Sequence, residues 1–138
     1  IQKEYFKKKY ISFINPEYIK CVEDKEGKLI AFSIVMPSIT EALQKAKGKL
    51  FPFGFLHLLK AKKQSKDVIF YLIGIHPDYQ NKGVTAIIFN EYYNTFKKNG
   101  IVNCIRSPEL EDNIAIHLLW KNFNPIVHCK RKTYRKDL

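Results

Sequence analysis

The stretch VIFYLIGI (residues 68–75), followed by HPDYQNKG (76–83) and VTAIIFNEYYNTF (84–96), decides the fold. Its first part is nearly unbroken apolar sequence, which is typical of a central strand covered on both faces. The second part is polar and holds one glycine, as a tight turn does. In the third part, apolar residues recur every three or four positions, which predicts an amphipathic helix ending near Gly100. The three parts together predict a strand–turn–helix unit.

A turn of this kind is suited to binding an anion. The first backbone N–H groups of a helix have no partner inside the helix, and the helix dipole favours negative charge at the same end. Gly83 would let a ligand approach the backbone without meeting a side chain. Two common phosphate motifs are absent, because the sequence has neither Gly-x-Gly-x-x-Gly nor Gly-Lys-Ser/Thr here. We therefore expect a phosphate cradle of another family.

The rest of the chain alternates helical and β-rich segments. Residues 4–14 carry an apolar stripe at helical spacing, and residues 18–22 and 28–36 are β-rich runs that predict an antiparallel hairpin. The Ser38-x-x-Glu41 spacing predicts a capping box that opens a helix to Lys47, with a second helix starting at Pro52. Further segments are predicted as a strand (101–105), a helix (111–123) and a last strand (126–134). This order indicates one mixed α/β domain over residues 1–138.

Length and composition limit the class of protein. With 138 residues, 46% of them hydrophobic and 27% charged, the chain can form one globular domain. Its apolar runs are far shorter than the roughly 20 residues of a membrane-spanning helix, so we expect no membrane span. Three widely spaced cysteines fit reduced cytoplasm better than a disulfide framework. Because the sequence begins at Ile1, we expect a piece of a longer protein with an upstream domain.

The formal charge of +11 leaves several partners open. A basic surface can meet nucleic acid, an anionic membrane face or a phosphate-bearing small molecule. The densest basic tract, residues 130–136, reads as the solvated face of the last strand. A basic nucleic-acid-binding module is therefore kept as an alternative, although no recognition helix or stacking platform is evident in the sequence.

The turn resembles a known family. Residues 80–85 (QNKGVT) are similar to the Gln/Arg-x-x-Gly-x-Gly/Ala pattern of the GNAT N-acetyltransferase superfamily, and residues 75–79 (IHPDY) are similar to its Val-x-Pro-x-Tyr. Thr85 departs from the pattern. Asn113 stands seven residues before Trp120, the spacing at which family members place a coenzyme-contacting Asn and a Tyr. Residues 40–54 and 130–138 further resemble the C-terminal half of larger bacterial GNAT-like proteins.

This resemblance implies the α/β (α+β) GNAT fold, with a mixed, mostly antiparallel sheet flanked by helices and a helical insert (38–66) between two strands. It implies an acyl-CoA (acetyl-CoA) dependent N-acyltransferase that transfers the acyl group directly to an unknown amine acceptor. The insert would form the acceptor pocket. The residues implied in coenzyme binding are those of the strand end, the turn and the last helix: Leu72, Ile73, Gly74, Ile75, Gln80, Asn81, Lys82, Gly83, Val84, Thr85 and Asn113.

The residues for catalysis are less well defined. Trp120 occupies the position near the thiol where family members have Tyr, and an indole N–H is far too weak an acid to protonate a leaving thiolate. A catalytically degenerate CoA-binding module is therefore the first alternative. We expect a carboxylate as general base, Glu109 by position and Glu41 second, and a tyrosine as substitute acid: Tyr92, Tyr93 or Tyr134.

The histidines and cysteines give no further site. We expect structural roles for His76 and His117, and we find no partners for His57 or His128. Neither Cys104 nor Cys129 has a base nearby in the sequence that would activate it as a nucleophile. No His/Cys/Asp cluster has metal-ligand spacing, so we expect no metal.

Overall fold

The computed structural model describes residues 14–49, 51 and 53–136, which form two compact units, Ile1–Ile105 and Arg106–Leu138. The helix predicted over residues 4–14 lies outside the described residues, apart from Ile14. The chain has a mixed α/β fold with a four-stranded sheet in the order β1-β2-β3-β4. The mixed fold class predicted from the sequence is confirmed.

The predicted hairpin forms the first half of the sheet. After a short 3-10 turn, η2 (Pro16–Tyr18), strand β1 (Ile19–Glu23) pairs antiparallel with β2 (Leu29–Pro37). The intervening turn is closed by the Asp24 carboxylate, which accepts hydrogen bonds from the N–H groups of Glu26 and Lys28. Strand β2 in turn pairs antiparallel with β3 (Asp67–Ile75), the apolar strand identified first in the sequence.

A β-bulge interrupts the pairing of β2 with β3. Ile34 stands opposite Leu72, whereas the next residue, Val35, stands opposite Phe70. Tyr71 is therefore the extra residue in β3, and it shifts the phase of the strand by one. On the N-terminal side of the bulge Val68 and Phe70 are buried, and on the other side Leu72 is 39% exposed. The sequence predicted that both faces of β3 are covered, and this prediction holds for only part of the strand.

Strand β4 (Asn103–Arg106) begins beside the start of β3. The N–H groups of Val102 and Asn103 both donate to Lys66 O, at 2.7 and 3.3 Å. The two strands therefore start together, as parallel neighbours do, and α4 (Val84–Asn99) connects them. Because β4 has four residues and β3 has nine, β4 can accompany only the first half of β3. The second half of β3, which precedes the turn at residues 76–83, therefore extends beyond the end of β4.

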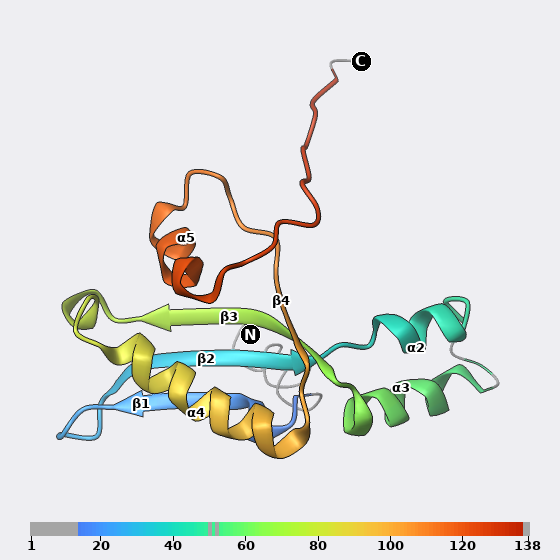
Figure 1. The fold of residues 1–138 in the computed structure, drawn as a ribbon, viewed down its shortest axis with the longest axis horizontal. Helices are drawn as coiled ribbons and strands as arrows, with labels where there is room; N and C mark the ends of the chain where they lie inside the picture. The colour runs from blue at the N-terminus through green and yellow to red at the C-terminus, as the bar shows by residue number, and fades with distance from the viewer. Residues whose placement is uncertain (1–13, 50, 52, 137–138) are drawn as a thin grey trace, which may run out of the picture. The chain divides into compact units, whose positions relative to one another are not determined.

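Helix α4 covers one face of the sheet (Figure 1). Its Ile88 and Tyr92 are 1% exposed, and Phe70 of β3 contacts the rings of Phe89, Tyr92 and Phe96. The Tyr92 hydroxyl lies 3.0 Å from the carbonyl oxygen of Tyr18 in η2 and 2.9 Å from that of Ser33 in β2. Burial raises the pKa of Tyr92 to about 12.

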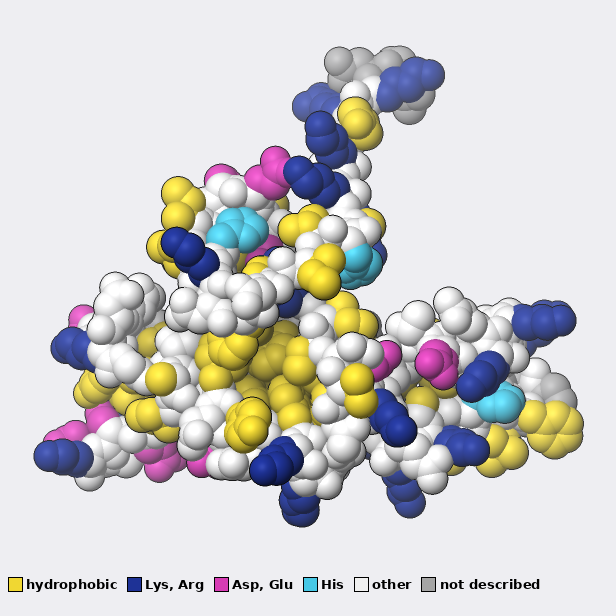
Figure 2. All heavy atoms as spheres, viewed as in Figure 1, with side chains coloured by type: hydrophobic (Ala, Val, Ile, Leu, Met, Phe, Trp, Pro, Cys, Tyr) yellow, Lys and Arg dark blue, Asp and Glu magenta, His cyan; other side chains and the backbone are white. Residues whose placement is uncertain are grey.

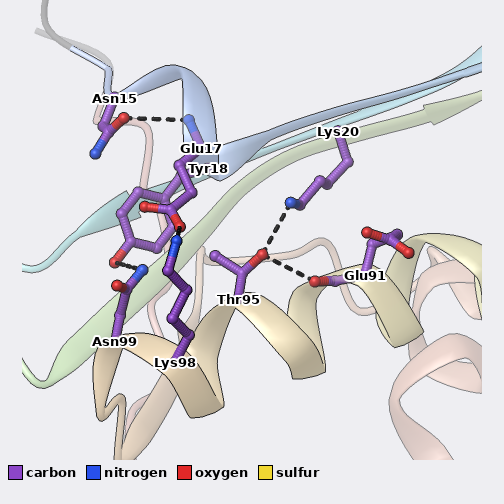
Figure 3. A network of polar contacts seen from close by, with 8 residues as sticks. All are labelled: Asn15, Glu17, Tyr18, Lys20, Glu91, Thr95, Lys98 and Asn99. Atoms are coloured by element: carbon purple, nitrogen blue, oxygen red, sulfur yellow. Dashed lines mark hydrogen bonds and ion pairs between the residues drawn. The ribbon is translucent and has the colours of Figure 1, made fainter.

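Polar contacts along the edge of α4 add to this packing. Lys20 Nζ donates to Thr95 Oγ1 at 2.9 Å, Lys98 pairs with Glu17 at 3.2 Å, and Asn99 Nδ2 donates to the Tyr18 hydroxyl at 3.3 Å (Figure 3). Each contact joins the last turns of α4 to η2 or β1. They fix the helix against the first strand at its C-terminal end.

The helical insert forms two short helices, α2 (Thr40–Lys45) and α3 (Gly54–Gln64), at the end of the sheet where β2 ends and β3 begins (Figure 1). The predicted capping box is absent. Residue Ile39 is the N-cap, Glu41 pairs instead with Lys45 at 3.4 Å, and the Ser38 hydroxyl donates to Thr40 Oγ1. Helix α3 also runs further than predicted, because Lys60–Gln64 is composed of good helix formers.

The second unit contains α5 (Ile114–Trp120) and a 3-10 turn, η4 (Lys121–Phe123). The strand predicted over residues 126–134 is wrong. Its alternating apolar residues resemble a strand, but among the described residues none of them pairs with another strand, and all are exposed. The inward face predicted for the last helix is likewise not observed, since Ile114 is 67% and Leu118 is 60% exposed.

Candidate functional site: a backbone cradle and a carboxylate cluster

The predicted cradle lies between β3 and α4. After β3 comes a 3-10 turn, η3 (Pro77–Tyr79), in which the His76 side chain caps the N–H of Asp78 at 3.4 Å. The last backbone hydrogen bond of this turn is donated by Gln80 N–H to Pro77 O. The next one along the chain is donated by Ala86 N–H to Gly83 O. Among the described residues, no hydrogen bond to another protein group is found for the N–H groups of residues 81–85. These groups form the donor set that a phosphate needs.

Two residues of the cradle have left-handed backbone conformations. Asn81 has φ 57° and Gly83, the N-cap of α4, has φ 79°. Asparagine and glycine tolerate this region better than other residues do. A Cβ placed on Gly83 would meet nothing within 4 Å, so the space in front of this backbone is open. The open approach that the sequence predicted at Gly83 is present.

The cradle is tied to the β1–β2 turn. The Tyr79 hydroxyl donates to Asp24 Oδ2 at 3.3 Å, and His76 N–H donates to Ile30 O at 2.8 Å. Hydrogen bonds, chiefly from the Lys28 N–H, hold the pKa of Asp24 below its ordinary value, so Asp24 stays a charged acceptor for Tyr79. The Gln80 side chain donates to Ile75 O at 3.4 Å. Asp24 is not among the predicted site residues, because nothing in the sequence links positions 24 and 79.

Gly74 has a role that the sequence did not reveal. It stands opposite Phe32 on β2, and a Cβ at Gly74 would lie 2.7 Å from the Phe32 ring. A larger residue at position 74 would therefore require the Phe32 ring to move. Its backbone, with that of Leu72, Ile73 and Ile75, lies in the half of β3 that extends beyond β4. The resemblance to GNAT proteins implied that this backbone segment meets the coenzyme arm.

The residues implied in catalysis lie mostly in the second unit, where Glu109 is the centre of a cluster. Its Oε2 lies 3.1 Å from Arg106 Nη1 and 3.7 Å from His117 Nδ1, and its Oε1 accepts a hydrogen bond from Trp120 Nε1 at 3.0 Å. The Arg106 guanidinium also lies 5.7 Å from the centre of the Trp120 ring. The cluster ties the segment before α5 to the end of that helix. Sequence reasoning found Glu109 and Trp120 but did not connect them.

Asn113 is the N-cap of α5, and its Oδ1 accepts a hydrogen bond from Ile116 N–H at 3.3 Å. Its amide NH₂ group is oriented by this cap.

Beside α5 an open hollow of about 610 Å³ is lined partly by Arg106, His117 and Lys121. Its described lining contains no acidic side chain, so it does not suit a cationic amine.

Several other candidates do not fit a catalytic role. Tyr92, predicted as a substitute acid, is 1% exposed and hydrogen-bonded to two backbone carbonyls, which makes it a core residue. Glu41 is a surface partner of Lys45. Partial burial and the Asp67 carboxylate raise the pKa of Cys104, which keeps the thiol protonated. Tyr93 and Tyr134 are exposed, as are His57 and His128. Within the described ranges, no group of three metal-binding side chains comes together.

Comparisons with known proteins agree with the fold. No family model matches the sequence, and a search of curated proteins finds no match. Solved structures do match. An aminoglycoside N-acetyltransferase AAC(6')-Iy in complex with CoA matches with a TM-score of 0.55 and 13% identity over 87% of this chain and 75% of that one.

Two further structures give the same picture. Aminoglycoside 6'-N-acetyltransferase AAC(6')-IG from Acinetobacter haemolyticus has a TM-score of 0.56 and 12% identity, and covers 100% of this chain and 83% of its own. A ribosomal-protein-alanine N-acetyltransferase from Brucella melitensis biovar Abortus 2308 has a TM-score of 0.54 and 10% identity over 86% and 70%. The chain has the GNAT fold. No described helix is long and apolar enough to cross a membrane.

Proposed function

We propose that this chain is an acyl-CoA-dependent N-acyltransferase that uses acetyl-CoA or another acyl-CoA as donor. The observation that carries the proposal is the cradle: N–H groups in residues 81–85 that bond to no other described protein group, a left-handed Gly83 with open space at its Cβ position, and the N-terminus of a 16-residue helix. Such a site favours the pyrophosphate of coenzyme A. The likeness in fold to a CoA-bound acetyltransferase supports the same ligand.

The half of β3 next to the cradle would hold the rest of the donor. Leu72–Ile75 extends beyond the short strand β4, so its backbone can pair with the amides of a pantetheine arm as a strand would. In the reaction the acceptor amine attacks the thioester carbonyl, an amide bond forms, and the carbon–sulfur bond breaks to release the coenzyme thiol. A base must first take one proton from the acceptor's ammonium group to free the attacking lone pair. The nitrogen loses a second proton as the amide forms, and the thiolate takes up one proton from an acid or from water.

Glu109 is our candidate for that base, acting directly or through water. Each of its oxygens already accepts one hydrogen bond, and each has a second lone pair for a water.

Three exposed, free cysteines fit a reducing compartment, so we place the reaction in the cytoplasm. The acceptor is an amine, and the insert on α2 and α3 is the element that we propose to contribute to its selection.

A second function is favoured by a specific observation. The Trp120 indole N–H, at the position where the GNAT pattern places a tyrosine, is committed to Glu109 at 3.0 Å and is no acid. A chain with the cradle but without an acid could bind acyl-CoA without transferring the acyl group. Such a CoA-binding module would use the same cradle but would release no thiol.

The test is isothermal titration of the protein with acetyl-CoA and longer acyl-CoAs, with Gly83→Ala as the variant. An alanine at φ 79° is strained and its Cβ enters the open space, so we expect binding to weaken at least about tenfold. Gly100→Ala is the matched control. Gly100 has φ 64° and equally open surroundings, but it is the C-cap of α4, at the opposite end of that helix from the cradle.

The result that would overturn the proposal is the absence of heat with every acyl-CoA, or an equal loss in both glycine variants. Thiol release in the presence of a panel of amines then separates the two functions. Release shows transfer, whereas binding without release across the panel shows the CoA-binding module.

A further inference from the structure

The helical insert carries large apolar side chains on its outside. Between and along α2 and α3, the following side chains are exposed by 41–81%: Phe51, Phe53, Phe55, Leu56 and Leu59. Phe51 and Phe55 lie beside each other, with ring centres 6.2 Å apart. Single exposed apolar residues are common on protein surfaces, but a contiguous group of this size marks an interaction site.

This exposure occurs on a defined helical pair. Helices α2 and α3 pack against each other, with Ala42 and Gly54 buried. A Cβ on Gly54 would clash with the carbonyl of Lys49, so the start of α3 sits directly against the chain that leaves α2. Gly48 N–H closes the end of α2 on Leu43 O at 3.0 Å. The packing of α2 on α3 thus involves the backbone at Lys49 and Gly54 and leaves Phe51 and Phe53 exposed by 81% and 69%.

The same element is strongly basic. Residues 38–66 contain seven lysines and one acidic residue, Glu41, which already pairs with Lys45. Lys60 and Lys63 are exposed on α3, on the same helix as the exposed leucines. Figure 2 shows hydrophobic side chains and Lys/Arg side chains next to each other at the α2–α3 end of the molecule. Exposed apolar and basic side chains are therefore neighbours on the insert.

We propose that the insert is a docking surface for an anionic membrane, with the phenylalanines and leucines entering the headgroup boundary and the lysines meeting acidic lipid headgroups. Apolar side chains next to a basic face are what interfacial helices use to lie on a bilayer. A nucleic acid would use the charge and could stack on aromatic rings, but it has no use for Leu56 and Leu59. The proposal does not depend on the proposed acyl transfer.

The test is flotation of the full chain with vesicles of phosphatidylcholine alone or mixed with phosphatidylglycerol. We expect the protein to float with the mixed vesicles at low salt, and much less with the neutral ones. Replacing Phe51→Ser and Phe53→Ser together, or Lys60→Glu and Lys63→Glu together, should each weaken partitioning about tenfold or more. These side chains are exposed, so the fold should be retained, which circular dichroism can check.

Matched controls alter the same chemistry elsewhere in the chain. Lys25→Glu with Lys97→Glu makes the same charge change outside the insert, and Val102→Ser with Ile126→Ser removes equally exposed apolar side chains. Both control proteins should float as the parent does. The proposal is overturned if the parent does not bind mixed vesicles, or if controls and insert variants lose binding equally. Phenylalanine-dependent dimers without vesicle binding, or oligonucleotide binding that ignores the phenylalanines, would also overturn it.

Discussion

The two units of the chain differ in how they are held together. In the first, the sheet and α4 enclose a core in which Val35, Val68 and Ile88 are at most 1% exposed, with Tyr92 hydrogen-bonded at its centre. In the second, Trp120 is the only buried side chain among residues 106–136, and the polar contacts of Glu109 hold the segments together. The cradle thus rests on a packed core, whereas the candidate base rests on a few polar contacts.

The largest effect that separates the two units is expected at the centre of the first. Tyr92→Ala removes a buried ring, its contacts with Phe70 and Phe96, and a hydrogen bond to a backbone carbonyl, which should lower the free energy of unfolding by about 4 kcal/mol. Tyr93→Ala is the neighbouring control, because Tyr93 is 65% exposed on the same helix. Urea unfolding measures both. Equal losses in the two variants would mean that Tyr92 is not a core residue.

A smaller effect should appear at high pH. The pKa of Tyr92 is raised to about 12 by burial, against about 10 in an unfolded chain. Below pH 10 both states keep the proton; between pH 10 and 12 the unfolded state releases it first, so stability falls by about 2 kcal/mol. Tyr92→Phe should lack this part of the decline.

The measurement is urea unfolding of both proteins from pH 8 upward. Tyr18, whose pKa burial also raises, contributes equally to the two proteins and cancels in the comparison. If the stabilities of parent and Tyr92→Phe stay parallel through this range, the Tyr92 hydroxyl does not titrate as a buried group.

The smallest effect is expected in the second unit. Leu118 is 60% exposed on α5, so Leu118→Ser should change the free energy of unfolding by no more than about 0.5 kcal/mol. The same urea experiment measures it. A loss well above 1 kcal/mol would show that this side of α5 is covered, and would remove the contrast between the two units.

Much of the first unit could be predicted from the sequence because its signals are local. The apolar run 68–75, the glycine and polar turn, and the helical period from Val84 are each sufficient to define an element, and β3 and α4 follow them closely. The hairpin of β1 and β2 was equally clear. The predicted capping box failed because α2 begins one residue later than the box requires: Ile39 is the N-cap, so Ser38 lies outside the helix and Glu41 is its second residue rather than its third.

The second unit was predicted less well because alternation alone does not make a strand. Residues 126–134 alternate apolar and polar side chains as a strand does. Strand formation also needs a neighbouring strand to pair with, and the local sequence does not show whether one is present. The site shows the same division. Backbone donors in the cradle follow from glycine and turn chemistry, whereas the contact of Glu109 with Trp120 and the contact of Tyr79 with Asp24 join positions 11 and 55 residues apart.

The extra residue at Tyr71 lets one strand serve two purposes. In a strand without a bulge, side chains alternate between the two faces of the sheet along the whole length. The residues that face the core in one half therefore determine which residues face the same side in the other half. The bulge resets that alternation between Phe70 and Leu72. Residues before and after the bulge can therefore change largely independently of one another, although Gly74 stays limited by the Phe32 ring beside it. Deleting Tyr71 would leave Phe70 opposite Val35 and Leu72 opposite Ile34 in a regular ladder, so it would remove the local bend and twist that the bulge gives the strand and keep the pairing of β3 with β2.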